Sequence, residues 1–155
     1  MKFIAHRGNI DGPKMDLENR PEYIEDALAS GFDSEIDLWF INNDLKYFLG
    51  HDFPQYEVTI EWLERYSKNL WIHCKNQAAI FEMSKNRNLN FFWHQNDDYT
   101  ITSFGYIWAY PGMEVNSQSV LVLPERNQDI TKLNSLKINS YGICSDYVKS
   151  LNNYK

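Results

Sequence analysis

The segment EIDLWFINNDLKYFLGHD, residues 35–52, carries the pattern that most constrains the fold of this chain. Within it, Glu35 and Asp37 alternate with Ile36 and Leu38. Residues i and i+2 of a strand share a face, so the pattern predicts a strand with two carboxylates on one side and apolar side chains on the other. Neighbouring carboxylates on a half-buried strand repel each other and need a cation, a proton or water between them. An acidic pair on the solvent-exposed side of an antiparallel strand is the simpler interpretation of this segment alone. The motifs elsewhere in the chain are needed to choose between a solvated acidic pair and a functional one.

The composition is that of a folded domain without a basic surface. A chain of 155 residues can bury a real core, so we expect one domain spanning residues 1–155. The net charge is −6 and the pI is about 5.1, which argues against nucleic acid and anionic membranes as partners. No pattern in the chain indicates its oligomeric state.

Two features predict a cytoplasmic location. Cys74 and Cys144 both fall in expected strands, which is typical of reduced thiols in a protein core. The first eight residues lack the apolar stretch and cleavage site of a secretory signal. No run reaches the ~18 apolar residues of a membrane span, so we expect no such span.

The first part of the chain alternates between strands and helices. Residues 2–5 form a short apolar strand that ends at His6-Arg7-Gly8. Pro21 suits the first turn of a helix that Gly31 ends, and strands follow over residues 32–41 and 45–49. This alternation favours parallel β-α-β units, which makes a wet antiparallel strand less probable for the acidic pair.

The pattern continues past residue 52. Thr59 is placed to cap a helix, and residues 70–75 form a strand in which Trp71, His73 and Lys75 share one face. Further along, we expect a helix over residues 78–85, strands over 91–94, 105–112, 120–123 and 141–145, a poor helix over 130–136, and a short helical tail through 151.

Four short motifs occur in a fixed order along the first 52 residues. They are His6-Arg7-Gly8, Glu18-Asn19, Glu35-x-Asp37 and Gly50-His51-Asp52. In order and approximate spacing this set resembles the glycerophosphodiester phosphodiesterase family, within the phosphatidylinositol-phospholipase-C-like phosphodiesterases. The strong match covers residues 3–52. The strand with Lys75 and the segment 143–147 are weaker echoes of the same family.

The resemblance implies a metal-dependent phosphodiester hydrolase. His6 and His51 would form a general acid–base pair on either side of the phosphodiester, since two imidazoles titrating near neutrality can divide the proton transfers. Glu35 and Asp37 would hold a divalent cation, Mg²⁺ or Ca²⁺, which explains how two carboxylates can face each other beside an anionic substrate. The implied partner is a small phosphodiester substrate.

The same resemblance implies which residues contact the substrate. Arg7 and Lys75 are similar to the phosphate-contacting cations of the family, and Glu18 and Asn19 would order the site from a loop. One ligand position departs from the family pattern, because His73 occupies the place of a third metal-binding carboxylate. Imidazole is a softer donor than carboxylate, so Mn²⁺ or Zn²⁺ becomes possible. The alternative is a degenerate barrel that binds phosphate-containing ligands without turnover.

The resemblance also implies a fold. Its members are (β/α)₈ barrels, a fold that typically takes ~250 residues. At 155 residues, this chain predicts an α/β fold of a small, trimmed or irregular TIM-type (β/α) barrel with a reduced helix layer in the C-terminal half. Aromatic residues such as Trp93, Tyr106 and Trp108 would fill its core more readily than stack on a substrate.

Overall fold

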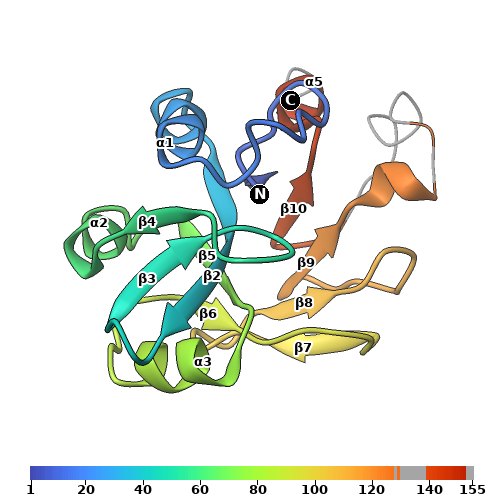
Figure 1. Cartoon of the computed structure of the whole chain (residues 1–155). Helices are drawn as coiled ribbons and strands as arrows, with labels where there is room; N and C mark the ends of the chain where they lie inside the picture. Colours follow the sequence, from blue (N-terminus) through green and yellow to red (C-terminus); the bar gives the residue numbers. More distant parts are fainter. Residues whose placement is uncertain (128, 130–138, 153–155) are drawn as a thin grey trace.

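The structure is a computed structural model that describes residues 1–127, 129 and 139–152 (Figure 1). Its strands are β1 (Lys2–His6), β2 (Asp33–Ile41), β3 (Lys46–Leu49), β4 (Tyr56–Val58), β5 (Leu70–Cys74), β6 (Phe91–Phe92), β7 (Tyr99–Ile101), β8 (Ile107–Ala109), β9 (Ser119–Val122) and β10 (Gly142–Ser145). The helices are α1 (Pro21–Ala29), α2 (Ile60–Arg65), α3 (Gln77–Ser84) and α5 (Val148–Asn152), with a 3₁₀ turn, η1, over Pro124–Arg126.

All ten strands belong to one curled, mixed sheet (Figure 1). Seven of them run parallel in the order β8-β9-β10-β1-β2-β5-β6. β3 pairs antiparallel with the second half of β2, β4 pairs antiparallel with β3, and β7 pairs antiparallel with β8. The curl brings the chain after β7 against β6, where the N–H of Ser103 donates to Phe91 O at 2.8 Å.

The expected TIM-type (β/α) barrel is wrong. In that fold every strand is followed by a helix, whereas here β6, β7, β8 and β9 follow one another without an α-helix, and β3 and β4 form antiparallel pairs. The described part of the chain contains four α-helices, and the longest has nine residues. The physical reason is length: hairpins and loops connect strands in far fewer residues than a crossover helix needs.

Most individual elements were predicted correctly. α1 begins at Pro21, and α2 is capped by Thr59, whose Oγ1 accepts from the N–H of Trp62 at 3.2 Å. The short strands β4 and β7 were not predicted, because three-residue segments are too short to show a period of two. The poor helix expected over residues 130–136 lies outside the described residues. No helix in the described residues is long and apolar enough to span a membrane.

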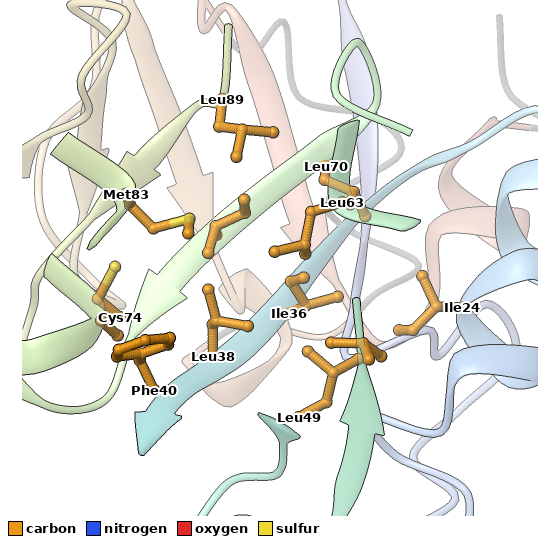
Figure 2. Close-up of a cluster of buried hydrophobic side chains, with 13 residues drawn as sticks. Ile24, Ile36, Leu38, Phe40, Leu49, Leu63, Leu70, Cys74, Met83 and Leu89 are labelled. Carbon is orange, nitrogen blue, oxygen red and sulfur yellow. The ribbon is translucent and has the colours of Figure 1, made fainter. Parts of the chain in front are cut away.

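Alternation along the strands divides the core into two layers. On β2, Ile36, Leu38 and Phe40 point outward and pack under α1, α2 and α3, in the cluster that Figure 2 shows. Cys74 of β5 belongs to the same outer layer and is a free thiol, as the sequence predicted. Burial raises the pKa of Cys74 to about 12, so it packs as a small neutral apolar residue.

The concave face of the curled sheet has its own core. Its buried members are Ile4, Trp71, Phe92, Trp108, Val120, Val122, Leu123 and Cys144, with Tyr106 and Tyr141 packed against them. Trp108 and Tyr106 are therefore core residues, as expected, while Trp93 packs against the outer cluster instead. This inner layer fills the middle of the concave face, so polar side chains that point inward must gather at its two ends.

Candidate functional site

The predicted site residues gather where parallel strands end on the concave face. His6 is the last residue of β1 and pairs in register with Glu35 of β2, while Asp37 pairs with His73 of β5. Arg7 and Lys75 follow the carboxyl ends of β1 and β5, and Gly50, before His51, donates its N–H to Asp37 O at 3.1 Å. Carboxyl ends of parallel strands are where α/β sheets place their functional side chains.

Glu35 and Asp37 are buried side by side, and not on a wet face. The Asp37 side chain is fully buried, and the Glu35 side chain is 4% exposed. Burial and the neighbouring charge of Asp37 raise the pKa of Glu35. Burial would also raise the pKa of Asp37, but the hydrogen bond from His73 and the charge of Arg7 outweigh it and hold that pKa well below its usual range. The solvated antiparallel strand is therefore excluded.

His73 presents one particular nitrogen to the carboxylates. Its Nε2 lies 2.9 Å from His94 O, and because a carbonyl only accepts, Nε2 carries a hydrogen. Its Nδ1 faces Asp37 Oδ1 at 3.0 Å and Glu35 Oε1 at 3.9 Å. A bare nitrogen lone pair and a carboxylate oxygen repel each other, so a proton or a metal cation must lie between them.

Two permanent cations surround Asp37. Arg7 Nε lies 2.9 Å from Asp37 Oδ2, as a charge contact without hydrogen-bond alignment, and Lys75 Nζ lies 3.4 Å from Oδ1. Arg7 Nη1 also donates to Glu18 Oε2 at 3.1 Å. Asp37 is thus shared among several positive groups, and Arg7 and Lys75 supply permanent positive charge to the site.

Asn19 fixes Asp37 from the loop before α1. Its Nδ2 donates to Asp37 Oδ2 and its Oδ1 accepts from the N–H of Asp37, both at 2.9 Å. Asn19 and Arg7 both have left-handed backbones, with φ of 61° and 52°, and the N–H of Asn19 donates to Arg7 O at 3.2 Å. Such backbone strain outside glycine concentrates at functional sites, and here it aims two side chains at one carboxylate.

His6 is oriented from the other side by Asp146, the residue after β10. Its Nδ1 lies 2.8 Å from Asp146 Oδ1, which also accepts from Asn9 Nδ2 at 2.8 Å. Burial lowers the pKa of His6, but the hydrogen bond to Asp146 and the charge of Glu35 outweigh it, so the pKa is raised. Because Nδ1 is taken by Asp146, Nε2 is the atom available to a ligand.

His51 is the most exposed of the site histidines. Its side chain is 45% exposed, and Nδ1 lies 2.7 Å from Oδ1 of Asp52, the next residue in the chain. Burial and the positive charge of Arg7 lower the pKa of His51, while the charge of Asp37 acts in the opposite direction. His51 therefore approaches the same group of charges from the loop between β3 and β4.

Two residues of this network were missed by the sequence analysis. Asp146 was noted only as part of a segment similar to the family's last strand, and Asn9, which follows His6-Arg7-Gly8, was not considered. Asn9 is fully buried and joins both halves of the site, because its Nδ2 also lies 2.9 Å from Glu18 Oε1. Its place directly after the first motif was the available signal.

Glu35, Asp37 and His73 form a group that could hold a metal ion. One ligand atom from each lies within 4.8 Å of the others. Two carboxylates and one imidazole make a mixed oxygen and nitrogen donor set, which suits Mn²⁺ or Zn²⁺ better than the all-oxygen shells of Mg²⁺ or Ca²⁺. The hydrogen bond from Nε2 to His94 O is the kind of outer contact that orients a metal-binding histidine.

No protein-family model matches the chain, and no curated protein matches it in sequence. The function therefore has to be argued from the geometry of the site.

Proposed function

We propose that this protein hydrolyses a small phosphodiester, with His6 and His51 as the proton carriers. The observation that supports this most directly is the convergence of two histidines, two permanent cations and a potential metal-binding group at one end of the concave face. Cleaving a phosphodiester needs positive charge for the phosphoryl oxygens, a base for the nucleophile and an acid for the leaving alkoxide. Each of these needs has a candidate among the side chains described above.

The opposite pKa shifts of the two histidines suit a division of labour. His51, with its lowered pKa, is neutral near pH 7 and takes a proton from the attacking water. His6, whose raised pKa lets it hold a proton to higher pH than a free imidazole, gives that proton to the departing alkoxide. The water oxygen forms the new bond to phosphorus as the ester P–O bond breaks, so one proton is taken and one is returned in each turnover.

The charged residues around Asp37 would hold the phosphoryl group. Arg7 and Lys75 supply two permanent cations, and Glu18 and Asn19 keep Arg7 and Asp37 in place. A divalent cation bound by Glu35, Asp37 and His73 would neutralise phosphoryl charge and lower the pKa of an attacking hydroxyl. The mixed donor set makes Mn²⁺ or Zn²⁺ the preferred ion in this proposal.

One observation favours a second candidate, a protein that binds phosphate compounds without turnover. Both oxygens of Asp37 already have cationic neighbours, because Oδ2 contacts Arg7 while Oδ1 contacts His73 and Lys75. A site in which side chains already neutralise the carboxylate can bind an anion without a metal. In that case the two histidines would position the ligand and transfer no proton.

Hydrolysis of bis(p-nitrophenyl) phosphate in the presence of Mg²⁺, Ca²⁺, Mn²⁺ or Zn²⁺ separates the two candidates. We expect activity with Mn²⁺ or Zn²⁺ that falls at least a hundredfold in His6→Ala and His51→Ala, since general acid–base groups contribute about 10²–10⁴-fold. Lys75→Ala should lower the activity as well, whereas Lys85→Ala, at an exposed position directly after α3, should not. Activity that survives His6→Ala unchanged would exclude the mechanism, and binding of the diester without turnover would favour the second candidate.

The finer statements about partners and location are also proposals. We propose a small, soluble diester as the substrate, because the side chains of Arg7 and Lys75 are only 17% and 16% exposed. A cytoplasmic location is proposed on the free, buried thiols of Cys74 and Cys144.

A further inference from the structure

The side chain of Glu125, in η1, holds the segment of chain that carries Asp146. Its Oε1 accepts from the N–H of Asp146 at 2.8 Å and from Ser145 Oγ at 2.9 Å. Asp146 is the first residue after β10, so a side chain here takes the place of a partner in the strand ladder. Glu125 thus fixes the backbone of the residue that contacts His6.

Two further contacts hold the same turn. Gly12 donates its N–H to Asp146 O at 2.7 Å, and the N–H of Tyr147 donates to Ser145 Oγ at 3.0 Å. The Ser145 hydroxyl therefore links Tyr147 to Glu125, because it accepts from the backbone and donates to the carboxylate. Ser145 is fully buried, which shields these bonds from competing water. The backbone of Asp146 is thus fixed at both its N–H and its C=O.

The backbone that leads to Glu125 is strained. Leu123, directly after β9, has φ of 43° and ψ of 52°, a left-handed conformation that a bulky side chain rarely adopts. Such strain concentrates at functional sites, and Arg7 and Asn19 of the candidate site show it as well. β9 and β10 lie side by side (Figure 1), and the turn at Leu123 places Glu125 against the end of the neighbouring strand.

The Glu125 carboxylate also carries a buried oxygen without a partner. No group in the described residues bonds to its Oε2, and this atom is closed to solvent. A buried acceptor of this kind costs free energy and offers no place to a ligand. The charge of Glu125 reaches the interior, because burial and then the charges of Glu35, Asp146 and Glu125 raise the pKa of the Cys144 thiol. A carboxylate kept at such a cost is typical of a functional role.

We propose that Glu125 is a positioning residue of the candidate site, which fixes the turn after β10 so that Asp146 holds the His6 ring with Nε2 left to a ligand. The carboxylate of Asp146 accepts, so Nδ1 of His6 carries the hydrogen between them. In the proposed phosphodiesterase, the placement of Nε2 decides how readily its proton reaches the leaving alkoxide. That consequence rests on the proposed function, whereas the orientation of the ring does not.

Nuclear magnetic resonance of the ¹⁵N-labelled full chain tests the orientation of His6 without a substrate. The His6 side chain is 9% exposed, so its Nδ1–H should exchange slowly with water and give a proton signal in wild type that His6→Gln lacks. Glu125→Gln keeps the acceptor oxygen and should keep the signal. Glu125→Ala removes the acceptor and should lose the signal through exchange, and Glu125→Asp, which keeps the charge but is too short to reach, should lose it too. A signal that persists in both of these variants, or is missing from wild type or Glu125→Gln, would overturn the proposal.

Hydrolysis of bis(p-nitrophenyl) phosphate with Mn²⁺ gives the second readout. We expect kcat to fall about tenfold or more in Glu125→Ala and Glu125→Asp, with KM changed less than about twofold, because Glu125 bonds to the turn and not to the cations that would hold the phosphoryl group. Glu125→Gln should stay within about threefold of wild type. Glu114→Ala, at an exposed position between β8 and β9, is the matched control and should change neither constant. A rise in KM with an unchanged kcat would contradict the positioning of His6.

The two readouts separate failure of this inference from failure of the proposed function. If wild type hydrolyses no diester while the His6 signal follows the expected pattern, the phosphodiesterase proposal fails and Glu125 keeps its positioning role. A residue that only stabilised the fold would lower Tm in Glu125→Ala and leave both kcat and the His6 signal unchanged well below Tm. That result in an active protein would overturn the proposal, and Glu125→Asp gives the same comparison if Glu125→Ala does not fold.

Discussion

Asp146 Oδ1 lies 2.8 Å from Nδ1 of His6, although 140 residues separate them in the sequence. The contact exists because β10 and β1, near the two ends of the chain, pair parallel from Lys2 with Gly142 to Ala5 with Ser145. The residues that immediately follow this pairing, His6 and Asp146, therefore emerge side by side. Pairing of the first strand of the chain with the last, inside the curled sheet, is what completes the candidate site.

Asp146→Asn should destabilise the protein in a pH-dependent way. The pKa of His6 is raised in the folded protein. Its contribution to the free energy of unfolding is therefore fully present below pH 6.5 and is lost as the pH rises through the folded-state pKa. For Asp146, the hydrogen bonds from His6 and Asn9 outweigh burial and lower the pKa. Its contribution to the free energy of unfolding is therefore present above pH 3.8 and is lost as the pH falls through the folded-state pKa. Both contributions act together between these values.

Urea denaturation of wild type and Asp146→Asn from pH 4 to 9 measures the free energy of unfolding of both proteins and tests this predicted pH dependence. We expect the largest difference, about 1.5–3 kcal/mol, between pH 4 and 6.5, and a smaller one at pH 9. Asp52→Asn is the matched control, since Asp52 is 80% exposed where it contacts His51. A difference that stays constant across the whole range would show that the charge pair is not the cause.

Local patterns predicted the elements and the faces of the strands well. Glu35 and Asp37 point to the concave face while Ile36 and Leu38 point to the outer core, as the alternation indicated. This succeeded because a period of two is a property of the strand itself. The position of His73 near Glu35 and Asp37 was implied only by the resemblance, and in the structure His73 pairs in register with Asp37 on the neighbouring parallel strand.

Connections between strands were much harder to predict. The antiparallel pairing of β3 with β4 and of β7 with β8 is decided by packing across the whole sheet. Although no helix was expected among the strands over residues 91–123, the short strands β4 and β7 carry no local signal that reveals these pairings. The same limit hid Asp146 and Asn9, whose roles arise from contacts between distant segments. A resemblance concentrated in residues 3–52 could not report on connections further along the chain.

Gly8→Ala should disturb the loop that presents Arg7. Gly8 has φ of 88°, and an added Cβ would meet Tyr23 Cδ1 at 2.8 Å and Ile24 Cδ1 at 3.1 Å. We expect a loss of about 2–4 kcal/mol in the free energy of unfolding, because steric conflict adds to backbone strain. Thermal and urea denaturation followed by circular dichroism measure it.

Gly31→Ala provides the matched control for that substitution. Gly31 has the same φ of 88°, but an added Cβ would meet nothing within 4 Å. Its expected cost is therefore backbone strain alone, about 1 kcal/mol. If the two variants lost the same stability, close packing of Gly8 against α1 would not be what requires glycine there.

The rate of diester hydrolysis should depend on pH with two opposing limbs. As the base, His51 must be neutral, so the rate rises with pH through its lowered pKa, on the acidic side of 6.5. As the acid, His6 must be protonated, so the rate falls with pH through its raised pKa, on the alkaline side of 6.5. Asp146→Asn should move only the alkaline limb, toward lower pH. An alkaline limb that does not move in this variant would contradict the assignment of His6.

His73→Glu should change which metal ion the protein prefers. The substitution replaces the imidazole with a third carboxylate next to Glu35 and Asp37, and all-oxygen sites favour Mg²⁺ and Ca²⁺. Isothermal titration calorimetry with each metal alone should show wild type binding Mn²⁺ at least tenfold more tightly than Mg²⁺, and this ratio should shrink in His73→Glu. Without metal the variant should also be less stable by about 1–3 kcal/mol, because a third negative charge replaces a group that donates to Asp37.

His73→Gln, which keeps the size but adds no charge, is the control, and it should weaken the binding of all four metal ions without shifting the preference toward Mg²⁺. Equal preference in wild type and His73→Glu would place the metal elsewhere and leave Asp37 to its contacts with Arg7 and Lys75.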